Sequence, residues 1–85
     1  MYEIIFDNKV IELLEKLQIS TRKRIFEKII STKEDPFHYF EKLKGRDEYK
    51  LRVGNYRVIA DINRTKKRIH VLVIGHRKSI YKRYF

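Results

Sequence analysis

The fold of this chain is decided by residues 49–62, which read YKLRVGNYRVIADI. Two β-prone runs, residues 49–53 and 56–62, flank the dipeptide Gly54-Asn55. Glycine and asparagine tolerate the left-handed backbone of a two-residue turn and are typical of a tight β-hairpin. The stretch therefore predicts two antiparallel strands in a register set by their turn.

The turn and the alternation of side chains divide the hairpin into two faces. Arg52 should lie directly opposite Arg57, with Lys50 beside them. Like charges across a sheet are destabilising, and a local cost without a local gain points to a functional site. The alternative is a solvated face on which the guanidinium groups splay apart. The apolar face, which should meet the core, consists of Tyr49, Leu51, Val53, Tyr56, Val58, Ala60 and Ile62. The charged face consists of Glu48, Lys50, Arg52, Arg57 and Asp61.

Upstream of the hairpin the pattern is helical. Residues 2–6 form a short β-prone run, after which Asp7-Asn8 can cap one helix and Ser20 a second. The connection between the helices is so short that they should form an antiparallel helical hairpin. Their apolar positions recur at helical spacing: Val10, Leu13, Leu14 and Leu17, then Ile25, Phe26, Ile29 and Ile30.

A connector joins the helices to the hairpin. Asp35-Pro36 marks a break. A mostly apolar connector follows and ends at Gly45; its apolar residues are Phe37, Tyr39, Phe40 and Leu43. We expect a short helical turn here, packed over an edge of the sheet.

The chain after the hairpin supplies one more strand. A polar turn at residues 63–68 leads into residues 69–74, an apolar run typical of a central strand covered on both faces, and a basic and aromatic tail follows to Phe85. The order β-α-α-β-β-β predicts one α+β domain over residues 1–85, with the antiparallel helical hairpin packed on a small, mostly antiparallel sheet.

The excess positive charge lies in the second half of the chain. Residues 1–43 carry eight Lys and Arg and eight Asp and Glu, whereas residues 44–85 carry thirteen and three, and so hold the whole net charge of +10. A polyanion site concentrates cations in this way. Nucleic acid is therefore the favoured partner, ahead of a solvated basic face or a protein partner.

Other classes of function lack a signal. Cysteine is absent, so the sequence offers neither disulfides nor thiolate metal ligands. The three histidines are scattered, without metal-ligand spacing. The N-terminus lacks the basic start and apolar run of a signal peptide, and no apolar stretch approaches the ~20 residues that span a bilayer. We expect a soluble, cytoplasmic protein without a metal or other cofactor and without a membrane partner.

A second cluster follows the central strand at residues 75–81, GHRKSIY. Arg77 is a candidate phosphate donor and Tyr81 a stacking ring or a phenol. His76 is a candidate proton carrier, although a structural role is the favoured reading. Structural roles are also the favoured readings for His38 and His70.

At these clusters the chain resembles the RelE branch of the RelE/ParE toxin superfamily. The matching stretches are residues 49–59, YKLRVGNYRVI, and residues 75–81, GHRKSIY, and residues 42–45, KLKG, resemble the family's loop before the hairpin. Length and element order also agree, so the resemblance covers essentially the whole chain.

The resemblance implies a toxin of a type II toxin–antitoxin pair with a fold like that of microbial RNases. Such toxins cut mRNA in the ribosomal A site without metal, and their partners are the ribosome, mRNA and a RelB-like antitoxin in an oligomeric complex. The alternative is a non-enzymatic protein, either a ParE-like gyrase-blocking toxin, which lacks the clustered Lys/Arg/Tyr site, or a basic RNA-binding module. The implied catalytic residues are Lys50, Arg57, Arg77 and Tyr81. The further RNA-binding candidates are Arg52, Lys44, Arg46, His76 and Lys78.

Metal-free cleavage needs a base for the 2′-OH, an acid for the leaving 5′-oxygen and cations for the phosphorane. Arg57 and Arg77 suit the cationic role because guanidinium groups match phosphate oxygens. Lys50 is a candidate base or an electrostatic clamp. Glu48 departs from the family's pattern, in which a lysine lies two residues before Lys50 in the best-known member, and its carboxylate is an alternative base. Tyr81 could stack on a base or carry a proton.

Overall fold

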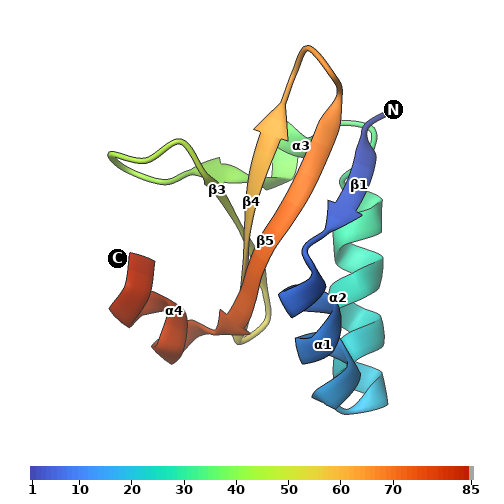
Figure 1. The fold of residues 1–85 in the computed structure, drawn as a ribbon, viewed down its shortest axis with the longest axis vertical. Coiled ribbons are helices and arrows are strands. Elements are labelled where there is room, and N and C mark those ends of the chain that lie inside the picture. The colour runs from blue at the N-terminus through green and yellow to red at the C-terminus, as the bar shows by residue number, and fades with distance from the viewer. Residues whose placement is uncertain (85) are drawn as a thin grey trace.

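A computed structural model describes residues 1–84. Five strands form one sheet in the order β1-β5-β4-β3-β2 (Figure 1). Only the β1–β5 pair is parallel among the strands of this sheet, so the expected mostly antiparallel α+β fold is confirmed. The strands are β1 (Glu3–Phe6), β2 (Glu41–Lys42), β3 (Tyr49–Val53), β4 (Tyr56–Asn63) and β5 (Arg68–His76).

Helices cover both faces of the sheet (Figure 1). The antiparallel pair α1 and α2 lies on one side, and α4 lies on the other. The helices are α1 (Asn8–Lys16), α2 (Ile19–Ser31), α3 (Pro36–Tyr39) and α4 (Arg77–Tyr84). The expected helical turn after Asp35 is α3, which has proline at its first position.

The predicted hairpin register is confirmed. Arg52 pairs with Arg57, and Val53 pairs with Tyr56 across the turn. Gly54 has φ of 58°, in the left-handed region that a side chain makes costly. An added Cβ there would also lie 3.0 Å from the guanidinium group of Arg24, which belongs to α2. The positive φ therefore requires glycine for the turn, whereas the Arg24 guanidinium group, at the end of a flexible side chain, could shift away from a Cβ.

Two hydrophobic clusters hold the layers together. The larger lies between the sheet and α1 and α2, and it includes the apolar hairpin face that the sequence predicts. The smaller lies between the sheet and α4 and is built from Leu43, Ile59 and Ile80, all almost fully buried. Gly75 allows this second contact, because a Cβ at that residue would lie 3.0 Å from the Ile80 side chain.

Two local expectations are corrected. Helix α2 begins at Ile19 with Gln18 at its N-cap position, so Ser20 lies inside the first turn and caps nothing. Leu17 and Gln18 are extended, and this two-residue link reverses the chain before Ser20. Strand β5 runs from Arg68 to His76 rather than over residues 69–74, since pairing with β4 continues as far as Tyr56.

Two elements have no counterpart in the expected order. Strand β2 is two residues long, and α4 occupies the basic tail up to Tyr84. Phe85, the end of that tail, is outside the described residues. Among residues 1–84, no helix is both long enough and apolar enough to cross a bilayer.

Candidate active site

A pocket of about 490 Å³ lies on the charged side of the hairpin. Its walls come from three parts of the chain: the segment through α3 into β2, the β3–β4 hairpin, and α4. It is lined by Phe37, His38, Tyr39, Phe40, Glu41, Lys50, Arg52, Arg57 and Tyr81. The structure thus brings together four of the residues that the sequence singled out, three cations from the hairpin and one phenol from α4.

Arg57 is the buried cation of this pocket, with 8% of its surface exposed. Its Nη1 atom donates hydrogen bonds to the carbonyl oxygens of Gly54 and Tyr56, each at 2.9 Å. These carbonyls belong to the turn region, so the turn itself holds the guanidinium group in place. Arg52, its cross-strand neighbour, is exposed. The like-charge pair is therefore stable because one member is bound by backbone carbonyls and the other is solvated.

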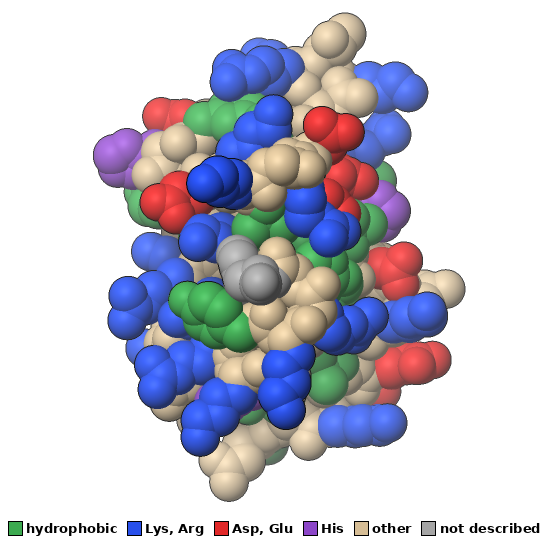
Figure 2. All heavy atoms as spheres, turned by 90° about the vertical axis from the view of Figure 1, so that its left-hand side faces the viewer, with side chains coloured by type: hydrophobic (Ala, Val, Ile, Leu, Met, Phe, Trp, Pro, Cys, Tyr) green, Lys and Arg blue, Asp and Glu red, His purple; other side chains and the backbone are tan. Residues whose placement is uncertain are grey.

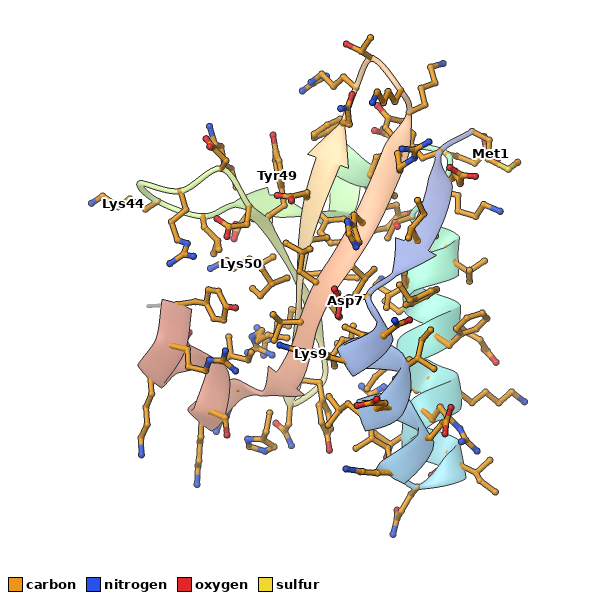
Figure 3. All side chains as sticks on the ribbon, viewed as in Figure 1. Met1, Asp7, Lys9, Lys44, Tyr49 and Lys50 are labelled. Carbon is orange, nitrogen blue, oxygen red and sulfur yellow. The ribbon has the colours of Figure 1, made fainter. Side chains whose placement is uncertain are left out.

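Lys50 and Tyr81 face the pocket from opposite elements. Lys50 points from β3 into the space between the sheet and α4, while its neighbour Tyr49 leaves the strand in another direction (Figure 3). The Lys50 Nζ atom lies 3.6 Å from Oε2 of Glu41, its cross-strand partner on β2. Tyr81 is half exposed on α4. A charged pair and a phenol thus line the same pocket.

Arg77 lies at the start of α4, outside the lining of this pocket. Its backbone N–H donates to the carbonyl oxygen of Asn55 at 2.7 Å, and its side chain is exposed. The contact ties the first turn of α4 to the hairpin turn.

His76 and Lys78 lie beside Arg77 and outside the same lining. The His76 ring packs edge-on against Tyr56, with centroids 5.8 Å apart. Its Nδ1 atom accepts a hydrogen bond from the Lys78 backbone N–H at 3.3 Å. Lys78 itself is exposed. A base or acid role for His76 is not tested by this arrangement and stays a prediction.

Glu48 is paired away from the pocket. The Arg46 guanidinium group donates two hydrogen bonds of 3.1 Å to its carboxylate, and these lower the pKa of Glu48. Arg46 also lies 4.9 Å from the centroid of the Tyr84 ring on α4. Arg46 and Lys44 line a separate hollow in the loop between β2 and β3. A catalytic role for Glu48 therefore remains a prediction, made of a residue outside the lining.

Sequence reasoning missed the α3 wall. The sequence predicts a connector over residues 37–40, FHYF, and a structural role for His38, yet this segment lines the pocket together with Glu41. The signal available in the sequence for this wall was an aromatic segment in which two of the rings, those of His38 and Tyr39, also carry polar atoms. The pairing of Glu41 with Lys50 could not be predicted from the sequence, because β2 has only two residues and carries no periodic pattern.

Positive charge spreads well beyond the pocket. Figure 2 shows Lys and Arg side chains over much of the face that bears α4, with acidic groups interspersed near its upper part. Within residues 1–84, no group of three or more His, Asp or Glu side chains is placed to hold a metal ion.

Residues 4–81 match the family described as the ParE toxin of the type II toxin–antitoxin system parDE. No curated protein matches the sequence.

Solved structures with this fold come from archaea and bacteria. A chain of the archaeal RelE–RelB complex from Pyrococcus horikoshii is 25% identical, with a TM-score of 0.75 over 89% of this chain and 94% of that one. A chain of the RelB–RelE complex from Methanococcus jannaschii is 28% identical, with a TM-score of 0.70 over 95% and 99%. A chain of the intact E. coli RelBE complex is 27% identical, with a TM-score of 0.73 over 89% and 96%.

Proposed function

We propose a function from the premise that this chain belongs to the RelE/ParE superfamily of type II toxins and is RelE-like. In this proposal the protein is an endoribonuclease that cuts mRNA in the ribosomal A site. One observation carries the proposal: one pocket is lined by residues from three elements, Lys50 and Arg52 of β3, Arg57 of β4 and Tyr81 of α4. Cations stabilise the charge that develops on a phosphorane, and a phenol or an amine can carry a proton.

Arg57 has the geometry for transition-state stabilisation. Its Nη1 donors are occupied by the turn carbonyls, and a guanidinium group has three further N–H donors, on Nε and Nη2. A cation fixed before the substrate arrives needs no reorganisation during the reaction. Arg57 therefore contacts the scissile phosphate in this proposal, and Arg77, at the mouth of the hairpin turn, contacts a neighbouring one.

Proton transfer is assigned to Lys50 and Tyr81. Both line the pocket, whereas Glu48 is bound by Arg46 and does not. A carboxylate with a lowered pKa is also a weaker base. We therefore favour Lys50 over Glu48 as the group that takes the 2′-OH proton, with Tyr81 as the second proton carrier or a stacking ring.

The ribosome has a physical role in the proposal. Lysine and tyrosine, the residue types assigned to proton transfer here, ordinarily have pKa values far above neutral pH, so the isolated enzyme should be slow. Holding the mRNA in the reactive geometry can supply a large part of a rate enhancement. The toxin would therefore act in the cytoplasm on ribosome-bound mRNA and barely on naked RNA.

The proposal is tested by adding the purified protein to translating ribosomes and mapping mRNA ends by primer extension. New ends at the A-site codon, which are absent without ribosomes, are the expected result. Intact mRNA at a protein concentration that saturates the ribosomes would refute it.

A second candidate rests on the family match itself, whose description is that of ParE toxins. A ParE-like protein would block DNA gyrase and leave mRNA intact. The clustered cations favour cleavage over this alternative. A supercoiling assay separates the two, because only the ParE-like function predicts inhibition of gyrase by the purified chain.

An antitoxin partner is part of the proposal. Several of the solved relatives are RelE–RelB complexes, and this chain has an apolar groove of about 520 Å³ lined mainly by α1 and α2. Exposed apolar side chains in it, Ile11, Ile19 and Phe26, suit an amphipathic helix of a RelB-like protein. Acidic residues of that protein would neutralise the basic face. Co-purification from the native host tests this, since a protein recovered alone, active and harmless to its cell would argue against a toxin.

A further inference from the structure

The α3 wall of the pocket contains two kinds of aromatic residue. Phe37 and Phe40 are anchors: Phe40 is buried, and the Phe37 ring contacts Tyr49 at 5.5 Å and carries the Arg64 guanidinium group 3.8 Å from its centroid. His38 and Tyr39 are exposed instead. The wall is thus fixed to the fold by its phenylalanines while two polar rings stay accessible.

The two accessible rings form a corner. Their centroids lie 4.9 Å apart and their planes are nearly perpendicular, at 84°. The Nζ atom of Lys28, from α2, lies 5.0 Å from the centroid of the Tyr39 ring. Lys28 does not line the pocket, whereas Tyr39 does. A cation from outside the pocket thus contacts the Tyr39 ring, while Tyr39 itself lines the pocket and stays 41% exposed.

The opposite wall has the complementary chemistry. Lys50 and Arg52 present positive charge to the same space, and a pocket of this volume is of the size that binds one small ligand. Single-stranded RNA offers flat bases on an anionic backbone. Proteins bind it by combining aromatic stacking platforms with cations that follow the phosphates.

We propose that one nucleobase of the bound RNA stacks on the Tyr39–His38 corner while its phosphate meets Lys50 and Arg52. This assignment rests on the proposed function, because it gives the RNA of the same pocket its base-binding contact. It makes Tyr39 a binding and positioning residue. The base that it holds would set where the backbone lies relative to Arg57.

The test is a binding experiment that needs no cleavage. A short 2′-O-methyl RNA, which lacks the nucleophile, is titrated with the protein at low salt, and fluorescence anisotropy gives its Kd. A series of the same RNA with one abasic position each is compared. Wild-type protein should lose about tenfold or more in affinity at one abasic position, as expected for one stacked base.

The variants show whether that loss depends on Tyr39. Tyr39→Ala should bind the complete RNA as weakly as the wild type binds the abasic one and should no longer respond to the missing base. Tyr39→Leu, which keeps apolar volume, should behave in the same way if alanine disturbs the fold. Tyr39→Phe should keep wild-type behaviour. Ile5→Ala, which removes an exposed apolar side chain of β1 outside both this pocket and the apolar groove, is the control.

An unchanged abasic effect in both Tyr39→Ala and Tyr39→Leu would overturn the inference, as would a Tyr39→Phe variant as weak as Tyr39→Ala. The dependence of binding on both the Tyr39 ring and one nucleobase is measured without any cleavage of the RNA. A wild-type protein that shows it without cutting mRNA on ribosomes would refute the nuclease and leave the stacking site in place.

Discussion

At the scale of single residues, the most informative side chain is Arg57. The sequence places it opposite Arg52, which would repel it. The structure resolves this conflict by burying Arg57 against two carbonyl oxygens of its own hairpin. A charge held in this way is oriented by the fold before any phosphate binds. That property is what electrostatic stabilisation of a transition state requires.

Arg57→Lys should therefore be nearly as damaging as Arg57→Ala. A lysine keeps the charge but cannot bind two turn carbonyls and a phosphate with fixed geometry. Loss of one preorganised donor corresponds to roughly a 100- to 1000-fold fall in rate. The measurement is single-turnover mRNA cleavage on ribosomes, with Lys66→Ala in the distal β4–β5 turn as the control. Full activity in Arg57→Lys would mean that charge alone suffices.

Lys50 and Glu48 make opposite predictions for the proton acceptor. Lys50→Ala should lower the cleavage rate about 100-fold or more, the usual contribution of a general base. Glu48→Gln should have little effect, because Arg46 engages that carboxylate outside the pocket. Ribosome binding is measured in parallel to separate binding from chemistry. A crippled Glu48→Gln variant beside an active Lys50→Ala variant would reverse the assignment.

At the scale of elements, helix α4 is needed to complete the pocket. It supplies Tyr81, and it is attached to the sheet through Ile80 over Gly75 and through the Arg77–Asn55 hydrogen bond. These contacts are few. The helix should be less stably held than the strands beneath it.

Gly75→Val should loosen α4 while leaving the sheet intact. The added methyl groups would collide with the Ile80 side chain, since a Cβ alone already lies 3.0 Å from it. Amide hydrogen exchange of residues 77–84 should become faster, with β4 amides as the internal reference, and cleavage should fall as Tyr81 loses its position. Unchanged exchange in α4 would show that Gly75 has no role in seating it.

The sequence predicts the elements that depend on neighbouring residues and does not predict the contacts between distant segments. The Gly54-Asn55 turn determines the register of β3 and β4, and apolar spacing identifies α1 and α2, because these signals depend on neighbours in the chain. The pairing of Glu41 with Lys50 and the seating of Ile80 on Gly75 depend on contacts between distant segments. The pocket is predicted in part for the same reason: its hairpin cations are local, whereas its α3 wall and α4 meet them only in the folded chain.

At the scale of the whole molecule, charge asymmetry dominates. Residues 44–85 hold the entire net charge of +10, and they build the β3–β4 hairpin, β5 and α4. The balanced first half builds the helical layer with its apolar groove. One molecule thus combines a strongly basic half with a charge-balanced half that carries an apolar groove.

Binding to single-stranded RNA should weaken as salt rises, because each neutralised phosphate releases counterions. Four contacts, by Lys50, Arg52, Arg57 and Arg77, correspond to a log–log slope of about −3, at roughly −0.7 per contact. Arg52→Ala should make the log–log slope less steep by about 0.7, the value of one phosphate contact. Lys9→Ala, in the charge-balanced half, should leave the slope unchanged. A slope near zero for the wild type would remove the phosphate-binding role of the basic half.

The central claim, RNA cleavage by 2′-OH attack within this pocket, is tested most directly by changing one atom of the substrate. A programmed ribosome is supplied with an mRNA that carries a single 2′-deoxynucleotide at the mapped cut. The account predicts that this mRNA stays intact, while the matched all-ribose mRNA is cut to a 5′-hydroxyl end and a 2′,3′-cyclic or 3′-phosphate end. Cleavage of the 2′-deoxy mRNA at the same position, or 5′-phosphate ends on the ribose one, would contradict it.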